Sequence, residues 1–169
     1  MRRIIPLLFA IPLLVVIAPS VAKAQERVGK ETLRGLKGVY VLANMTKADD
    51  EQQGLRQNQL QTDVELRLRK AGIYVATETE RSNSNFGTLY IGVAIKQIRG
   101  FPMYSYLITV ELNQPVSLVR NPSMKILAAT YAVGDILGTV GADHLVDVRH
   151  SVSDAVDTFI NDYLAMNQK

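Results

Sequence analysis

The alternation of side chains between Tyr104 and Leu118 constrains the fold more than any other feature of the sequence. In this stretch, YSYLITVELNQPVSL, every even-numbered residue except Gln114 is apolar. A two-residue period of this kind is typical of a β-strand that buries one face. We therefore expect the even-numbered side chains to form the inner wall of a sheet that is covered by helices.

The length of this strand raises a second expectation. A straight strand from Tyr104 to Leu118 would span roughly 50 Å, whereas a compact domain of this size has a diameter of about 38 Å. Pro115 cannot donate a hydrogen bond to a neighbouring strand. The sequence therefore predicts a kink at Gln114–Pro115 and a hairpin tip, around residues 120–125, near or beyond the rim of the domain.

The turn after this strand also predicts a strand pairing. Asn121-Pro122-Ser123 is a turn signal, and residues 124–133 that follow are rich in β-formers. A three-residue loop would place Leu118 opposite Ile126, which matches the apolar faces of the two strands. The glycine-rich stretch GDILGTVGAD then predicts a mobile connector, or alternatively a loop that holds an anion at the start of the next helix.

Two segments have the apolar periodicity of amphipathic helices. The first helix has a stripe of four apolar residues and ends at Gly72, which suits a left-handed cap. The second helix runs from Asp143, a candidate N-cap, to Asn167. The first stripe is Leu60, Val64, Leu68 and Ala71, and the second is Leu145, Val148, Val152, Ala155, Val156, Phe159, Ile160, Tyr163 and Met166.

Three further stretches predict strands, at residues 36–45, 73–77 and 89–95. The element order is then β-α-β-β-β-β-α. This order predicts a two-layer α+β domain, with a mixed five-stranded sheet and both helices on one face. We expect one domain over residues 35–169, preceded by a flexible lead-in at residues 25–34.

The N-terminus has the three parts of a secretory signal peptide. Arg2 and Arg3 precede an apolar run at residues 4–18, and Ala22 and Ala24 provide small residues before a cleavage site at Gln25. We expect residues 1–24 to be removed and the mature protein to be periplasmic or secreted through the general secretory route. It would then have no stable membrane span. The alternative is an uncleaved N-terminal anchor.

The charge of the mature chain argues against nucleic acid as a partner. Arg2, Arg3 and Lys23 leave with the signal peptide, so that 16 of the 19 basic residues remain against 16 acidic ones. A chain with no excess of positive charge gains little from counterion release on a phosphate backbone. The sequence has no cysteine, which excludes disulfides and a lipid-anchored cysteine.

Motifs for catalysis are sparse. The chain lacks G-x-S-x-G and has no cysteine for a Cys-His pair. Asp147, His150 and Asp154 share one face of the last helix and could present ligands to a metal. The simpler interpretation is a solvated polar helix face. We expect no cofactor, and we favour a non-catalytic protein over an enzyme.

The outer face of the predicted sheet is the candidate interaction surface. Tyrosines beside small residues can form a recognition surface, and Gly92 and Ala94 would leave a shallow floor between larger side chains. The alternative is a merely solvated face. The candidate residues are Tyr90, Lys96, Ser105, Leu107, Thr109 and Glu111 on the face, with Arg120 at the hairpin tip.

Three segments together resemble a family of small secreted bacterial proteins of unknown function. They are LQTDVELRLRKAGI, VSLVRNPSMKILAATYAVGDILGTVG and FINDYLAMN. The resemblance covers residues 33–167 and implies no catalytic residues. In element order the chain is also similar to periplasmic domains of envelope-assembly and export machineries, which is a likeness of fold alone.

These observations predict a non-catalytic binding or assembly module of the bacterial cell envelope. It would contact a protein partner through the outer sheet face or the hairpin tip at residues 114–126. A small metal-dependent hydrolase that uses Asp147, His150 and Asp154 is the alternative from another class. Carriage of a small ligand between sheet and helices would require a cavity that the sequence does not reveal.

Overall fold

The computed structural model describes residues 29–46 and 55–168. The predicted signal peptide, with its cleavage residues Ala22, Ala24 and Gln25, lies outside the described residues. The elements along the chain are η1 (Lys30–Leu33), β1 (Gly38–Met45), α1 (Gln57–Lys70), η3 (Glu78–Glu80), β2 (Phe86–Gln97), β3 (Met103–Leu118), β4 (Asn121–Gly141), η4 (Ala142–His144) and α2 (Val146–Asn167).

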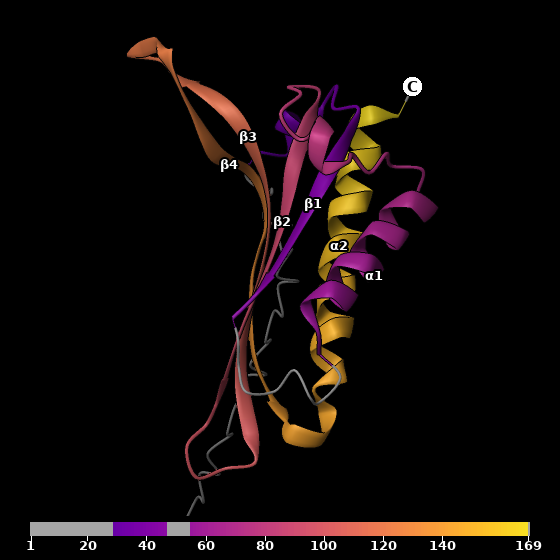
Figure 1. The fold of residues 1–169 in the computed structure, drawn as a ribbon, viewed down its shortest axis with the longest axis vertical. Coiled ribbons are helices and arrows are strands. Elements are labelled where there is room, and N and C mark those ends of the chain that lie inside the picture. Colours follow the sequence, from indigo (N-terminus) through magenta and orange to yellow (C-terminus); the bar gives the residue numbers. More distant parts are fainter. Residues whose placement is uncertain (1–28, 47–54, 169) are drawn as a thin grey trace, which may run out of the picture.

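The sheet contains four strands in the order β1-β2-β3-β4. β1 pairs with β2 in parallel, and the other two pairs are antiparallel. Both helices lie on the same side of this sheet (Figure 1). The prediction of an α+β fold with a mixed sheet and two helices is confirmed, but the prediction of five strands is wrong.

The missing strand is the segment at residues 73–77. It forms a single parallel bridge between Val39 and Val75. The Val39 amide donates to the Tyr74 carbonyl at 3.0 Å, and the Ala76 amide donates to the Val39 carbonyl at 2.9 Å. The chain then turns into η3, so no ladder develops beyond this bridge.

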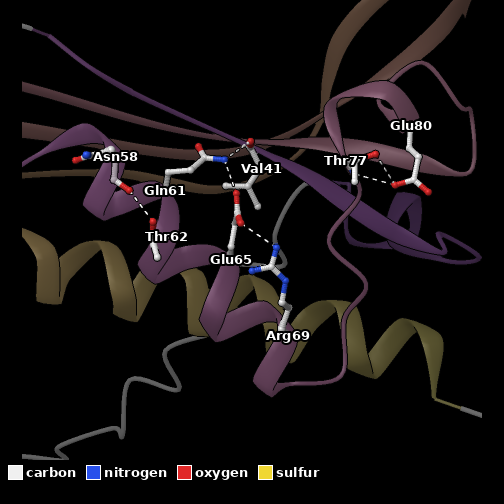
Figure 2. A network of polar contacts seen from close by, with 8 residues as sticks. All are labelled: Val41, Asn58, Gln61, Thr62, Glu65, Arg69, Thr77 and Glu80. Carbon is white, nitrogen blue, oxygen red and sulfur yellow. Dashed lines mark hydrogen bonds and ion pairs between the residues drawn. The ribbon is translucent and has the colours of Figure 1, made fainter.

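A glutamine of α1 occupies the edge of β1 beyond the bridge. The Gln61 side chain accepts from the Ala43 amide at 2.9 Å and donates to the Val41 carbonyl at 2.8 Å. It also donates to Glu65 at 2.7 Å, and Glu65 in turn pairs with Arg69 at 2.9 Å, as Figure 2 shows. One side-chain amide therefore takes the place that a peptide group of a fifth strand would have.

Replacing Gln61 with alanine should lower the free energy of unfolding by about 1–2 kcal/mol, because two part-buried backbone groups lose their partner. Urea unfolding monitored by circular dichroism would measure this loss. Thr62→Ala is the control, since the Thr62 hydroxyl bonds only the Asn58 carbonyl of its own helix among the contacts drawn in Figure 2. Equal stability of the two variants would contradict the role of Gln61.

From Tyr104 to Leu112 the even-numbered side chains of β3 face the core, as predicted, whereas Gln114, Val116 and Leu118 lie beyond the part of β3 that pairs with β2 and are partly exposed. Tyr104, Ile108, Val110 and Leu112 are buried, at 5% exposure or less. The stripe on α2 packs on them, with only Met166 partly exposed among its predicted members. On α1, Leu60, Val64 and Leu68 are buried in the same core.

Part of the segment predicted as a flexible lead-in packs against this core. Lys30–Leu33 form η1, and the Leu33 side chain is fully buried. The Asn167 side chain, at the end of α2, donates to the Leu33 carbonyl at 2.8 Å. The Lys30 ammonium pairs with Asp162 of α2 at 2.9 Å.

β4 is much longer than the predicted strand at residues 124–133. It continues through the stretch that we interpreted as a mobile connector or an anion-binding loop, and ends at Gly141. The register shifts opposite Val110/Glu111, where Gly134 has a φ of 110° that suits glycine. Both interpretations of the glycine-rich stretch are therefore wrong, because its glycines lie within a strand.

The start of α2 also differs from the prediction. The helix begins at Val146, after the 3-10 turn η4, and no side chain caps either element. Asp143 lies inside η4 rather than at an N-cap position. The extension of β4 explains this difference, since the chain leaves the sheet only at Gly141.

The pairing at the hairpin tip is shifted from the predicted one. Val116, rather than Leu118, pairs with Ile126, and Leu118 pairs with Asn121. The predicted Leu118–Ile126 pair is therefore wrong by two residues. The parity of the apolar faces is unchanged by a shift of two, which is why the sequence pattern could not distinguish these registers.

The β3–β4 hairpin leaves the rest of the sheet, as the strand length predicted. The last residue of β3 that pairs with β2 is Asn113, opposite Thr88. Beyond it, the two strands bend away from β1 and β2 (Figure 1). Two register shifts lie before Asn113 and a third lies between Ser117 and Leu118, so pairing is regular at the Gln114–Pro115 position predicted for the kink. We call residues 114–128 the arm.

Candidate interaction surfaces

The six predicted residues of the sheet face come together on its outer side. The ladder places Tyr90 opposite Glu111 and Lys96 opposite Ser105. Leu107 and Thr109 lie between these pairs, opposite Ala94 and Gly92. Arg120, the seventh candidate, is separate from them at the tip of the arm, where it is exposed.

The expected shallow floor at Gly92 is filled. A Cβ atom at this position would lie 2.9 Å from the ring of Tyr90. The tyrosine ring therefore lies along its own strand and covers the glycine. The Tyr90 hydroxyl also accepts a hydrogen bond from the side-chain amide of Asn44 in β1, at 3.4 Å.

Polar side chains on this face bond largely to one another. The Thr109 hydroxyl donates to Asp135 of β4 at 2.8 Å. Asn113 donates to Glu111 at 3.2 Å, and the Ser105 hydroxyl donates to the Lys96 carbonyl at 3.3 Å. These contacts stabilise the sheet and leave the face with few polar groups directed at a partner.

Apart from Leu107, which is part of this face, a group of large exposed apolar side chains lies on β4 and the arm. Val119 at the turn is 99% exposed and Leu127 is 58% exposed. The sequence predicted a contact tip at residues 114–126, which contains Val119 but not Leu127, without singling out its apolar side chains. The exposed apolar side chains of the arm are Val119, Met124, Ile126 and Leu127.

The arm is also uniformly basic. Arg120 and Lys125 are the only charged residues between Leu112 and Gly134. Both are exposed. This part of the surface therefore combines apolar side chains with positive charge, and residues 112–134 contain no acidic side chain.

A cleft of about 340 Å³ lies at the base of the arm. Its walls are formed by Glu78, Arg81 and Phe86 on one side and by Pro115 and Leu127 of the arm on the other. The cleft is thus partly apolar, with one acidic and one basic side chain at its border.

The charged wall of this cleft is tied to β1. The Tyr40 hydroxyl donates to Glu78, and the Arg81 guanidinium lies 5.3 Å above the Tyr40 ring. The hydrogen bond to Glu78, followed by burial, raises the pKa of Tyr40 above its ordinary value. Arg81 also pairs with Glu78 at 3.6 Å.

The turn that carries Glu78 is held by a capping box. The Glu80 carboxylate accepts from the Thr77 amide and from the Thr77 hydroxyl, both at 2.8 Å (Figure 2). These bonds, with one from the Tyr74 hydroxyl, lower the pKa of Glu80. The Tyr74 ring stacks on Phe86, with 5.5 Å between ring centroids. The wall of the cleft is therefore held together by hydrogen bonds and a ring contact.

A second groove, of about 630 Å³, lies between α1 and α2. Two ion pairs cross it, Arg67 to Asp157 at 2.6 Å and Arg149 to Asp63 at 2.5 Å. Its basic groups are thus largely used to hold the two helices together. His150 also lines this groove.

The candidate metal ligands of α2 do not form a metal-binding group. The His150 imidazole lies 3.7 Å from Asp147, and the His144 imidazole lies 4.0 Å from the same carboxylate, but these side chains are not arranged to hold an ion. Within residues 29–46 and 55–168, no group of three or more His, Cys, Asp or Glu side chains is arranged to hold an ion. The backbone carbonyl of Asp154 accepts a hydrogen bond from the Thr158 hydroxyl at 3.0 Å.

Comparison with known proteins does not assign a family. No protein-family model matches the chain, and no curated protein matches it. Among the helices in the described part of the chain, none has the length and apolar character needed to cross a membrane.

Proposed function

We propose that the protein is an exported, non-catalytic binding or assembly module of the bacterial cell envelope. It contacts a protein partner through the arm, with the outer sheet face beside it. The observation that supports this proposal is the arm itself, a projecting ribbon with exposed apolar side chains and only positive charge.

The arm has the composition of a contact surface rather than of a solvated hairpin. A two-stranded ribbon is marginally stable in water without a layer packed on it. Ile126 lies on the same face as its partner Val116, and Leu127 lies on the other face with Pro115. Apolar residues therefore occupy both faces, and exposed patches of this kind mark sites of interaction.

The charge of the arm specifies the chemistry of the partner. Arg120 and Lys125 lie near the tip without an acidic neighbour in residues 112–134. Complementary charge favours encounter and fixes the orientation of a complex. The partner surface should therefore be acidic and should offer an apolar cleft for the ribbon.

A charge-reversal variant tests the proposal. Arg120→Glu combined with Lys125→Glu should weaken binding to the partner at least tenfold, whereas the wild type should retrieve the same partner reproducibly by crosslinking from envelope extracts. Lys37→Glu combined with Lys70→Glu is the matched control, because both lysines are exposed and lie outside the arm. This control should retain binding.

Two results would count against the proposal. One is equal retrieval by the arm variant and its control. The other is binding of the purified protein to vesicles of anionic lipid that depends on the arm, with no protein partner retrieved. That second result would identify a lipid surface, rather than an acidic protein, as the target of the basic and apolar side chains.

A further inference from the structure

The two edge strands of the sheet, β1 and β4, differ in what covers their outer edges. At β1, the edge is covered by the Val75 bridge and by glutamines of α1, since Gln57 also accepts from the Met45 amide at 3.4 Å. At β4, no strand among the described residues pairs with the outer edge. Native proteins usually protect such an edge, often with lysine or proline. The segment Asp135–Gly141 has neither.

Apolar surface lies directly beside this unprotected edge. The Leu137 side chain is 78% exposed. Its neighbour across the ladder is Leu107 of β3, which is 37% exposed. A strand added to β4 would cover both leucines and would pair with the backbone groups of the edge that no described strand contacts.

The sequence of this segment is complementary to itself in the antiparallel direction. If two copies pair with Leu137 opposite Leu137, Asp135 falls opposite Thr139 and Ile136 falls opposite Gly138. Ile136 then faces the small Gly138, and Leu137 faces Leu137 of the second copy. The only charged residue, Asp135, faces a hydroxyl rather than a second carboxylate, so that the pairing brings no like charges together.

We propose that β4 pairs with β4 of a second copy of this chain, antiparallel and centred on Leu137, so that the two sheets become continuous. The inference is independent of the proposed function. The two arms would leave the joint sheet at opposite ends, because the paired strands run in opposite directions. Arg120 and Lys125 of the two copies would therefore not repel each other.

Cysteine crosslinking tests the register directly, since the chain has no cysteine of its own. Leu137→Cys should form a disulfide-linked dimer under mild oxidation, because directly opposite residues in a sheet have Cβ atoms about 4.5–5.5 Å apart, close to the separation in a disulfide. A mixture of Asp135→Cys and Thr139→Cys chains should crosslink, whereas each alone should not. Leu127→Cys, on the same strand but in the arm, is the control and should not form a disulfide-linked dimer.

Sedimentation velocity provides a second readout. The wild type should sediment as a dimer, and Leu137→Lys should raise the dissociation constant at least tenfold. Because Leu137 is mostly exposed, this change should leave the circular dichroism spectrum and the melting temperature of the monomer unaltered.

Either of two results would overturn the proposal. The first is a wild-type monomer at all concentrations, without disulfide formation at position 137. This result is expected if the chain before Gly29 covers the edge instead, since Gly29 lies against the Thr130 carbonyl of β4. The second is a dimer that Leu137→Lys does not weaken and that crosslinks equally at position 127.

Discussion

Phe159→Ala is expected to lower the free energy of unfolding by about 3–5 kcal/mol, the largest effect of any single change considered for this protein. The Phe159 side chain is fully buried on α2. Its ring lies 5.8 Å from that of Tyr131 and 6.0 Å from that of Tyr163, measured between centroids. Alanine would remove these aromatic contacts and leave a cavity between the helix and β4.

Urea unfolding with two probes would measure this loss. Phe159→Leu is the control, because it keeps much of the apolar volume and should cost less than about 1.5 kcal/mol. A cost for the alanine variant close to that of the leucine variant would show that the helix can settle into the vacated space. The aromatic cluster would then have little role in stability.

Asp162→Ala is expected to lower the free energy of unfolding by about 2–3 kcal/mol, since a charged hydrogen-bonding group is removed from a buried site. The Asp162 side chain is 8% exposed. It accepts from the Tyr131 hydroxyl at 2.8 Å and pairs with Lys30 at 2.9 Å. The carboxylate thus connects three elements, η1, β4 and α2.

A double-mutant cycle can separate the contributions of Tyr131 and Lys30 to the stabilisation of this carboxylate. Lys30 is 31% exposed, so solvent weakens the ion pair, and Lys30→Ala should cost less than Tyr131→Phe. Coupling of each variant with Asp162→Ala, measured by urea unfolding, gives the two interaction energies. A loss below about 0.5 kcal/mol for Asp162→Ala itself would contradict the central role of this residue.

The sequence predicted those parts of the fold that depend on one face being apolar. The even-numbered side chains of β3 from Tyr104 to Leu112 and the stripe on α2 face the core, because burial of apolar surface dominates the choice of side. The projection of the arm also followed from sequence, since Tyr104–Leu118 is too long for a domain of this size. These predictions needed no knowledge of contacts between distant segments.

The errors have a common physical origin in interactions that no local pattern encodes. Residues 73–77 have the sequence pattern of a strand. In the structure, the Gln61 side chain of α1 bonds to the edge of β1 where such a strand would continue. The stretch from Gly134 to Gly141 read as a loop because glycine is uncommon in strands. In the structure, Gly138 gives room to the ring of Tyr106, which a Cβ atom would approach to 2.5 Å.

The candidate surface was predicted only in part. Tyr90 and Glu111 do lie side by side on the outer face, as alternation requires. The exposed apolar side chains of the arm, such as Leu127, were missed. These side chains are exposed because the pairing of β2 with β3 stops at Thr88, so that no third strand of this ladder lies beside the arm. The length of one strand relative to another is a property of the whole sheet.

The attachment of the arm has a mechanical consequence. β3 runs without interruption from the arm into the centre of the sheet, where it is paired to β2 from Asn113 to Tyr104. A pull on the tip along the strand axis would load these hydrogen bonds in shear, all at once, since they lie perpendicular to the strands. Tension applied to the arm would therefore pass into the body of the domain instead of peeling the strands apart one bond at a time.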